Sequence, residues 1–350
     1  MHDWQFFSEL RQVIHDDPVG RGLDRIPGRS PFSFSAPDLQ PACQSLAATR
    51  QLEVAIVTGF YIPSAECYET DGPLGAVFLA EALHQMGAGV TLLSESGCTS
   101  VLEVALRLAN LEDHVGLVDL PLTNPAGFEQ WIRAFWERHP HLTHLISIER
   151  AGPSHTLASL TMQYGAQVAP VAEFVKTVDA GDWNRSYNMR GQELTAFTAP
   201  AYRLFETIPS HVVSFGIADG GNEIGMGRLP WDVIAGNIQH GGKIACRIPT
   251  QRLIVSGVSN WGAYALAAGT AWLKQRDELS KLFDADREAL LWEATLEKEP
   301  LVDGVTAENI LTVDGLTWSV YRQPMAAMQE LLRRRRSTEH GVSRIPFIHG

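Results

Sequence analysis

Short apolar runs alternate with amphipathic segments over most of the chain. Six runs, rich in β-branched or aliphatic residues, lie at positions 54–57, 90–93, 115–118, 144–148, 212–215 and 253–256. The segments between them have helical length, and residues 73–86 begin with a proline and are followed by Gly87 and Gly89, the usual residues at the two ends of a helix. This alternation predicts parallel strands joined by crossover helices.

The predicted fold is therefore α/β, with a mostly parallel sheet and helices on both faces, in a Rossmann-like three-layer sandwich. We expect residues 1–50 to form an N-terminal wrap and residues 51–350 to form a single catalytic domain. Residues 151–195 interrupt the alternation, so we interpret them as an inserted excursion that carries functional side chains. Sheets of this kind bind ligands beyond the carboxyl ends of their strands, which places the site at that edge.

Composition narrows the class of protein. The chain has 350 residues with a net charge of −12, and its acidic residues are dispersed, which argues against a nucleic-acid partner. No apolar run approaches the roughly 20 residues of a membrane helix, and neither end suggests an export signal. Four widely spaced cysteines without a CxxC pair fit reduced thiols. We expect a cytoplasmic protein with a small-molecule substrate and no membrane or nucleic-acid partner, and we leave a homo-oligomer open.

A glycine-rich stretch at residues 216–227 stands out. It follows an apolar run and places five glycines around Asp219, Asn222 and Glu223, so its backbone can approach a ligand beside oxygen-bearing side chains. The alternative is a turn whose acids cap the next helix. Because the stretch matches neither a Walker loop nor a dinucleotide fingerprint, we expect no nucleotide cofactor.

Acidic residues follow several of the predicted strands. The carboxyl ends of parallel strands share one edge of the sheet, so one pocket is expected to collect five of these acids: Glu69, Asp71, Glu149, Asp219 and Glu223. Carboxylates brought together in this way repel one another unless a cation or a raised pKa relieves them, and a set of oxygen ligands suits Mg²⁺ or Mn²⁺. As the alternative for about two of the five, we consider helix caps or ion pairs with Arg150 and Arg190.

These motifs together resemble the C-terminal domain of the D-glutamate cyclases. The resemblance spans roughly residues 10–275 and includes the segment 17–23, whose Arg21 could reach an anion, although we favour a plain surface turn. The motifs that carry it are Thr58-Gly-Phe60, Glu69-Thr-Asp-Gly-Pro-Leu-Gly-Ala76, Ile148-Glu-Arg-Ala-Gly152, Tyr187-Asn-Met-Arg-Gly191, Gly220-Gly-Asn-Glu-Ile-Gly-Met-Gly227 and Ser259-Asn-Trp-Gly262.

What the resemblance implies is a lyase that uses manganese, or magnesium, to interconvert D-glutamate and 5-oxo-D-proline with loss or gain of water. Residues fall into three expected roles: metal ligands Glu69, Asp71, Asp219 and Glu223; catalytic groups Glu149, Glu223 and Asp71; and substrate-binding groups Thr58, Arg150, Asn188, Arg190, Asn222 and Asn260. Two alternatives are a metal-dependent hydrolase of a phosphate ester or cyclic amide, and a metal- or amino-acid-binding protein without turnover.

Overall fold

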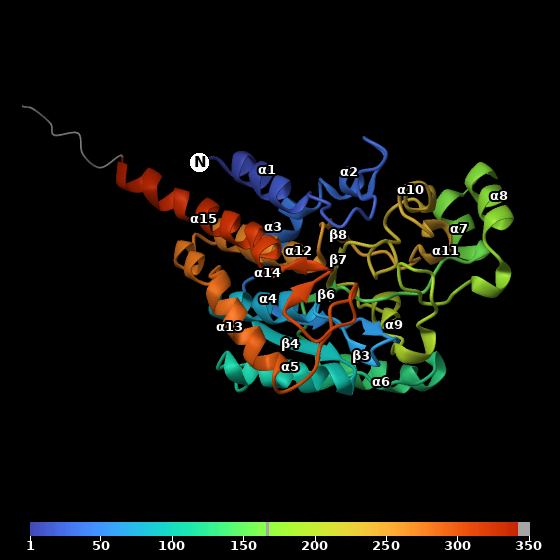
Figure 1. Cartoon of the computed structure of the whole chain (residues 1–350), viewed down its shortest axis with the longest axis horizontal. Coiled ribbons are helices and arrows are strands. Elements are labelled where there is room, and N and C mark those ends of the chain that lie inside the picture. The colour runs from blue at the N-terminus through green and yellow to red at the C-terminus, as the bar shows by residue number, and fades with distance from the viewer. Residues whose placement is uncertain (166–167, 342–350) are drawn as a thin grey trace, which may run out of the picture.

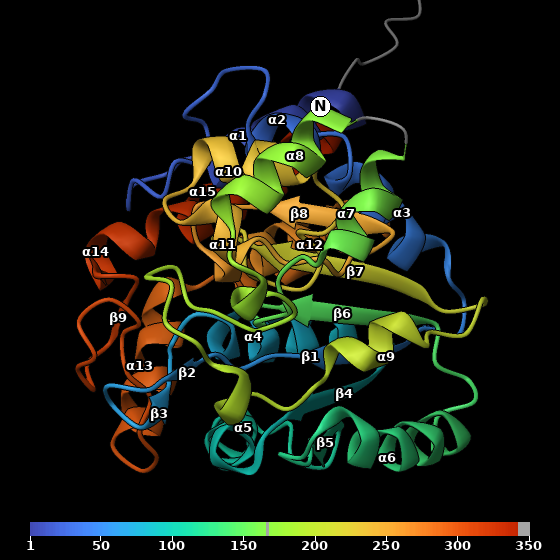
Figure 2. The same ribbon diagram turned by 90° about the vertical axis from the view of Figure 1, so that its right-hand side faces the viewer.

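The computed structural model describes residues 1–165 and 168–341. Its centre is a parallel sheet of six strands in the order β5-β4-β1-β6-β7-β8 (Figure 2). The strands are β1 (Glu53–Val57), β4 (Gly89–Ser94), β5 (Val115–Asp119), β6 (His144–Ile148), β7 (Val213–Ala218) and β8 (Arg252–Val255). The six apolar runs of the sequence correspond to these strands, with ends that differ by at most three residues.

The strand order defines where a ligand can bind. The chain builds the sheet outward from β1 to β5, then returns to the other side of β1 and builds outward again from β6 to β8. The order therefore reverses between β1 and β6, which are paired in parallel. In doubly wound sheets the crevice for the ligand lies at this reversal, beyond the carboxyl ends of the strands.

Alternating side chains of the strands build two cores on opposite faces of the sheet. Val54 and Ile56 of β1 join one buried cluster, and Ala55 and Val57 join the other. On the first face pack α3 (Leu39–Ala48), α4 (Pro73–Gln85), α5 (Ser96–Leu108) and α12 (Ser259–Leu273). On the second pack α6 (Pro125–Arg138), α9 (Tyr202–Glu206) and α10 (Trp231–Asn237). The predicted three-layer α/β fold is confirmed.

Helix α12 is the central helix of the first face. Every residue from Ser259 to Trp272 is buried, because the helix packs on the sheet, on α3 and on α4. Small side chains allow these close contacts: a Cβ at Gly75 of α4 would lie 2.7 Å from Oδ1 of Asn260, and one at Gly269 would lie 2.4 Å from Sγ of Cys43. The N-terminus of α12 therefore has a fixed position beside the sheet edge.

The first and last described helices pack against α12. Helices α1 (Asp3–Ile14) and α15 (Gln323–Gly341) contact each other and α12, as Figure 1 shows. The ring of Phe6 stacks on Trp272 with ring centroids 4.2 Å apart. The segment between α1 and α3 includes α2 (Pro31–Ser35). Before α15, helix α13 (Ala285–Leu296) is followed by a hairpin of β9 (Thr312–Val313) and β10 (Leu316–Thr317) and then by α14 (Trp318–Tyr321). These segments reach the carboxyl edge of the sheet.

The long connection between β6 and β7 also returns to that edge. It contains α7 (Leu157–Tyr164) and α8 (Val168–Thr177), and then forms bridges from Pro153 to Ser186 and from Tyr187 to Glu193. The excursion thus brings residues 188–192 to the region where β1 and β6 end.

Other short elements are β2 (Tyr61–Ile62), β3 (Cys67–Tyr68) and α11 (Gly241–Ile244).

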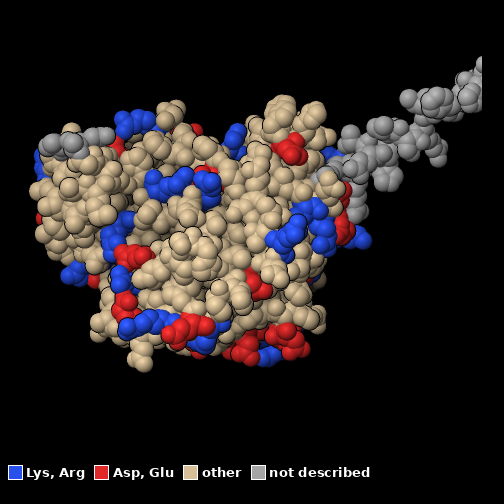
Figure 3. All heavy atoms as spheres, turned by 180° about the vertical axis from the view of Figure 1, so that it is seen from behind, with Lys and Arg blue, Asp and Glu red and all other residues tan. Residues whose placement is uncertain are grey.

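Three features bear on the expectations from composition: the surface charge, the hydropathy of the helices and the state of the cysteines. On the face shown in Figure 3, acidic and basic side chains of the described residues are interspersed. Within the described part of the chain, no helix combines the length and apolar character that crossing a membrane requires. All four cysteines are free, and three of them, Cys43, Cys98 and Cys246, are buried.

Candidate active site

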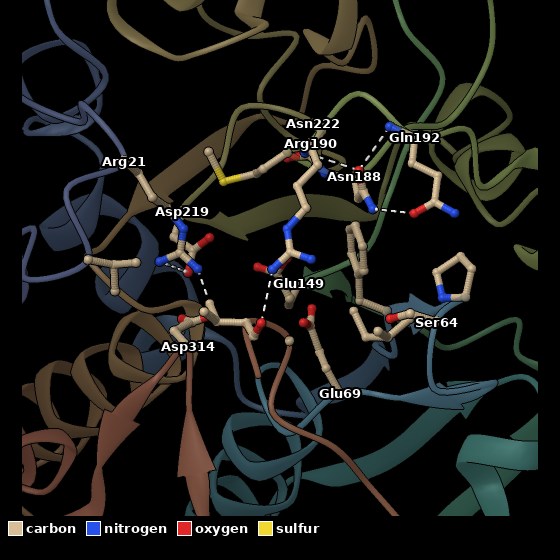
Figure 4. A pocket seen from close by; sticks show the side chains of 17 residues that line it. Arg21, Ser64, Glu69, Glu149, Asn188, Arg190, Gln192, Asp219, Asn222 and Asp314 are labelled. Atoms are coloured by element: carbon tan, nitrogen blue, oxygen red, sulfur yellow. Dashed lines mark hydrogen bonds and ion pairs between the residues drawn. The ribbon is translucent and has the colours of Figure 1, made fainter. Parts of the chain in front are cut away.

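A cavity of about 290 Å³ lies at the carboxyl edge of the sheet, where the strand order reverses. Figure 4 shows the side chains that line it, which come from six separate segments of the chain. They include Arg21, Phe60, Glu69, Glu149, Asn188, Arg190, Gln192, Asp219, Asn222 and Asp314. The predicted position of the site, at the carboxyl edge of the sheet, is confirmed.

The five predicted acids are all buried in or beside this cavity. Two groups of carboxylates are close enough to share a cation: oxygens of Glu149, Asp219 and Glu223 lie within 4.8 Å of one another, and so do oxygens of Asp71, Asp219 and Asp314. Asp219 belongs to both groups. The acids therefore form one continuous cluster with two adjoining positions for a cation.

The glycine-rich stretch after β7 forms a fixed loop. Oε1 of Glu223 accepts backbone hydrogen bonds from Gly220 at 2.6 Å and from Asp219 at 3.3 Å, which folds the loop back on itself. Gly225 has φ +111°, and its Cα would lie 2.7 Å from a Cβ at Gly216, so glycine is required where the two backbones meet. The loop is structural and also presents acids to the cavity.

Glu149 occupies a strained position at the end of β6. Its φ is +43°, in the left-handed region that a non-glycine residue seldom adopts. A backbone hydrogen bond of 3.2 Å from its N–H to the carbonyl of Ile217 holds this turn, and the hydroxyl of Ser259 donates to its Oε2 at 2.6 Å. Such strain is common at functional sites, where the surrounding structure fixes one side-chain direction. Here the direction is into the cavity.

Helices α4 and α12 cap each other. Asp71, just before α4, accepts backbone hydrogen bonds from Ser259 and Asn260 at the start of α12, both at 2.9 Å. In return, Oδ1 of Asn260 accepts from the backbone of Gly72 at 2.9 Å and of Gly75 at 2.6 Å, at the start of α4. Asp71 thus has the capping role considered for some of these acids, and neither Asp71 nor Asn260 lines the cavity.

Sequence reasoning missed Arg21 as a member of the site. We interpreted it as part of a surface turn, but the structure corrects this: its side chain is only 10% exposed and forms ion pairs with Asp219 at 3.3 Å and with Asp314 at 2.6 Å. It also donates to the carbonyl of Gly257 at 3.0 Å. Figure 4 shows its guanidinium between the two carboxylates. The partners lie about 200 or more residues away, so no local pattern indicates them.

The loop that carries Arg21 is organised by Asp17. The carboxylate of Asp17 accepts backbone hydrogen bonds from Arg21 at 2.9 Å, Gly22 at 2.8 Å and Leu23 at 3.1 Å. Gly22 has φ +95°, and a Cβ there would lie 2.2 Å from the carbonyl oxygen of Asn237. The turn signals of this segment, an aspartate and two glycines, therefore direct Arg21 inward.

Asp314 was also missed as a site residue. It lies at the tip of the β9–β10 hairpin, where Asp314 and Gly315 have φ +59° and +76°, as in a two-residue type I′ turn. An Asp-Gly pair is a common sequence for such a turn, so these residues fit the hairpin. The turn pattern does not show that the aspartate points into a cavity; that depends on the packing of the C-terminal segment.

Burial and mutual repulsion shift the acids toward their protonated forms. Burial, followed by the neighbouring carboxylates, raises the pKa values of Glu69, Asp71 and Glu149 well above their ordinary range. Burial also raises the pKa of Asp219 to about 6, although Arg21 opposes this shift. Burial likewise raises the pKa of Glu223. The cluster is therefore short of positive charge.

Two predicted substrate-binding residues point elsewhere. Arg150 is fully buried and forms an ion pair with Glu95, and it donates to the carbonyl of Gly59 at 3.0 Å and of Ala199 at 3.1 Å. It thereby joins the loop after β1 to the excursion. The hydroxyl of Thr58 is buried without a hydrogen-bond partner. Neither residue lines the cavity.

The excursion and the glycine-rich loop contribute three of the predicted substrate-binding residues. Oδ1 of Asn188 accepts backbone hydrogen bonds from Arg190 and Gln192, both at 3.0 Å, which forms a turn over the cavity. The guanidinium of Arg190 points down into the cavity (Figure 4) and donates to the carbonyl of Val305 at 2.9 Å. Asn222 donates to the carbonyl of Tyr187 at 2.8 Å. These three residues share the cavity with Glu149 and Asp219.

The donor set fits a hard divalent cation. Three buried oxygens at the cluster have no hydrogen-bond partner: Oε2 of Glu223, Oδ1 of Asn222 and Oδ2 of Asp314. An unpaired buried acceptor is costly, and carboxylate and amide oxygens are the ligands that Mg²⁺ and Mn²⁺ prefer. The described cysteines and histidines do not enter either group of acids. The residues therefore fit the predicted kind of metal.

The fold and site define a class: a doubly wound α/β protein with an acidic, partly closed cavity at the reversal of its strand order, suited to a small polar ligand. Within that class, the chain belongs to the family described as D-glutamate cyclase-like, C-terminal, whose model matches residues 10–181 and 174–329. The suspected family is confirmed.

A relative in Homo sapiens is named D-glutamate cyclase, mitochondrial. It is 30% identical to this chain over 274 residues, which cover 75% of this chain and 38% of the relative. The chain thus spans well under half the length of that protein. The match extends beyond the acidic loops and includes most of the fold described above.

The capping role of Asn260 leads to a prediction about stability. Replacing Asn260 by Ala leaves the buried N–H of Gly75 without an acceptor and leaves that of Gly72 with Asp71 alone, so we expect the free energy of unfolding to fall by about 1–3 kcal/mol. Chemical denaturation followed by circular dichroism measures this. The matched control Asn309→Ala, at an exposed position, should change it by less than about 0.5 kcal/mol. An unchanged stability for Asn260→Ala, with a raised KM instead, would favour a direct substrate contact.

Proposed function

We propose that this chain interconverts D-glutamate and 5-oxo-D-proline, as a lyase assisted by Mn²⁺ or Mg²⁺. The observation that carries the proposal is the cavity itself, a space of about 290 Å³ that is lined by the guanidinium-bearing Arg190 and by four acids, Glu69, Glu149, Asp219 and Asp314. Membership of the D-glutamate cyclase-like family and the name of the human relative support the same substrate. D-Glutamate and its cyclic form are small enough for this volume.

Glu149, Asp219 and Glu223 are the residues that would hold the metal. Their oxygens are mutually close, and Oε2 of Glu223 has no other partner. When bound, the ion would supply a Lewis acid that polarises the carboxylate undergoing reaction. Asp71 is less suited than the sequence suggested, because both of its oxygens accept backbone hydrogen bonds from α12. Glu69 lines the cavity and remains available to the substrate.

Charge complementarity suggests how the substrate lies. The guanidinium of Arg190 can bind the α-carboxylate of D-glutamate through two oxygens. The α-ammonium would then face the acidic wall, where Glu69 and Asp314 line the cavity. Asn188 fixes the turn that carries Arg190, and Asn222 presents an unpaired amide oxygen to the same space. The side-chain carboxylate of the substrate is thereby directed toward Glu149.

The residues present can move the protons that ring closure requires. Closure forms a bond between the α-nitrogen and the side-chain carbon and breaks a carbon–oxygen bond. The ammonium loses two protons, and these leave with the departing oxygen as water. Glu69 lines the cavity, and its pKa is raised by burial and by Asp314, so it can accept a proton from nitrogen and donate one to the leaving oxygen. Ser259 instead orients Glu149 as a metal ligand.

The compartment is also a proposal. We propose a reducing compartment such as the cytoplasm, because Cys43, Cys67, Cys98 and Cys246 are all free. The name of the human relative places that protein in mitochondria. Fractionation of the source cells, with detection of this chain by antibody, distinguishes the two locations.

A direct assay tests the proposed reaction. Purified protein incubated with D-glutamate or with 5-oxo-D-proline, with and without added Mn²⁺, is followed by chiral chromatography. We expect interconversion of the two compounds, with activity lost after chelation and restored by Mn²⁺. The L-enantiomers serve as matched controls. Absence of interconversion together with phosphatase activity would favour the hydrolase alternative, and thermal stabilisation by D-glutamate without any product would favour a binding protein.

Arg190 provides a prediction about substrate affinity. Replacing Arg190 by Gln removes the charge that faces the substrate carboxylate, so we expect KM for D-glutamate to rise about 10- to 100-fold, with a smaller change in kcat. The matched control is Arg185→Gln in the same excursion, where the arginine pairs with Glu193 outside the cavity. Equal effects of the two substitutions on KM would contradict the role of Arg190.

Metal affinity should depend on pH. A carboxyl with a raised pKa keeps its proton to higher pH, and metal binding must displace that proton. Because the pKa of Asp219 is raised to about 6 and those of Glu149 and Glu223 are also raised, Mn²⁺ competes with protons more strongly as the pH falls. We expect the Kd for Mn²⁺ to be at least about tenfold higher at pH 5 than at pH 7.5, measured from the electron paramagnetic resonance signal of free Mn²⁺. Equal affinities at both pH values would contradict this assignment of the ligands.

A further inference from the structure

Arg21 occupies one of the two positions for a cation in the acidic cluster. Its guanidinium lies between Asp219 and Asp314, at 3.3 Å and 2.6 Å, and is almost entirely removed from solvent. Both carboxylates belong to the group that also contains Asp71. A buried guanidinium keeps its charge, and Asp219 and Asp314 raise the pKa of Arg21 further although burial opposes this. The protein thus supplies a permanent positive charge at this position.

The oxygens of this first group are largely engaged within the protein. Asp71 accepts three backbone hydrogen bonds, from Gly72, Ser259 and Asn260. Oδ2 of Asp219 accepts from the backbone of Ser259 at 3.0 Å and pairs with Arg21. Oδ1 of Asp314 pairs with Arg21, which leaves only its Oδ2 unpaired on the cavity wall. A divalent cation would have to displace the guanidinium to bind here.

The second group differs because no cationic side chain forms an ion pair with Glu149 or Glu223 within the described residues. Glu223 is fully buried, yet its Oε2 has no partner at all. Glu149 is 5% exposed, and the hydroxyl of Ser259 donates to its Oε2. Leaving such carboxylates ionised without a counter-charge is costly in a buried site. This position therefore requires a cation from outside the protein.

We infer that the acidic cluster binds a single divalent cation, at Glu149, Asp219 and Glu223, and that Arg21 excludes a second ion from the adjoining position. Arg21 is thus a positioning residue that sets the number of metals, and Asp314 serves Arg21 and the substrate instead of a metal. The identity of the cation rests on the proposed function. The number of ions does not depend on turnover, so binding and catalysis can be tested separately.

The N-terminal loop is built to deliver this charge. Asp17 holds the backbone of residues 21–23 through three hydrogen bonds, and Arg21 donates to the carbonyl of Gly257 in the loop that precedes α12. Asp219, which pairs with Arg21, also belongs to the group of Glu149, and Ser259 donates hydrogen bonds to both Asp219 and Glu149. An N-terminal segment far from the other site residues in sequence therefore completes the acidic cluster.

The test is to count bound Mn²⁺ in the full chain and in three variants. Protein stripped with a chelator is titrated with Mn²⁺, and bound metal per chain is measured by elemental analysis after gel filtration and by the free Mn²⁺ signal in electron paramagnetic resonance. We expect one ion in the unmodified chain and two in Arg21→Met, which keeps an apolar stem but lacks the charge. In that variant the two neighbouring ions should also give an exchange-coupled signal.

Two further variants keep the inference testable if Arg21→Met fails to fold. Glu223→Gln should bind Mn²⁺ at least 100-fold more weakly, whereas Asp314→Asn should still bind one ion with a Kd within about threefold of the unmodified chain. Two ions in the unmodified chain, or loss of the ion in Asp314→Asn, would overturn the inference. One bound ion without any conversion of D-glutamate would uphold the inference and refute the proposed function.

Discussion

Repulsion among buried carboxyls is the constraint on which the rest of this site depends. Six acids from four segments converge at the edge of the sheet, and burial leaves little water to screen them. Three sources of positive potential oppose the repulsion: the guanidinium of Arg21, the backbone N–H groups at the start of α12, and protons held at raised pKa. A divalent cation at Glu149, Asp219 and Glu223 would complete the compensation.

Helix α12 connects this electrostatic problem to the fold. The helix is buried along its length against the sheet, α3 and α4, so its N-terminus stays beside the acids that accept hydrogen bonds from its N–H groups. The reciprocal hydrogen bonds of Asp71 and Asn260 fix α4 against α12 at the same point. The N-terminus of a helix favours negative charge, which makes α12 both the core helix of one layer and an electrostatic support of the site.

Sequence reasoning recovered the features that local patterns determine. Apolar runs identified the six strands, and acids that follow strands identified the edge and most of the cluster, because parallel strands end together. Arg21 and Asp314 escaped, since their roles arise from pairing between segments about 290 residues apart. Arg150 was predicted to bind substrate because the fork of an arginine can bind both oxygens of a carboxylate, but it pairs with Glu95, which follows a different strand, and it does not line the cavity. The spacing of residues along the sequence does not show which charged side chains pair across the fold.

We infer that the acidic cluster needs one external cation at a defined position. The most direct measurement is the anomalous difference density of crystals grown with Mn²⁺, recorded at wavelengths on both sides of the manganese absorption edge. We expect a single peak, bounded by the carboxylates of Glu149, Asp219 and Glu223, with the guanidinium of Arg21 still between Asp219 and Asp314. No peak at this position, or a peak that replaces the guanidinium, would contradict it.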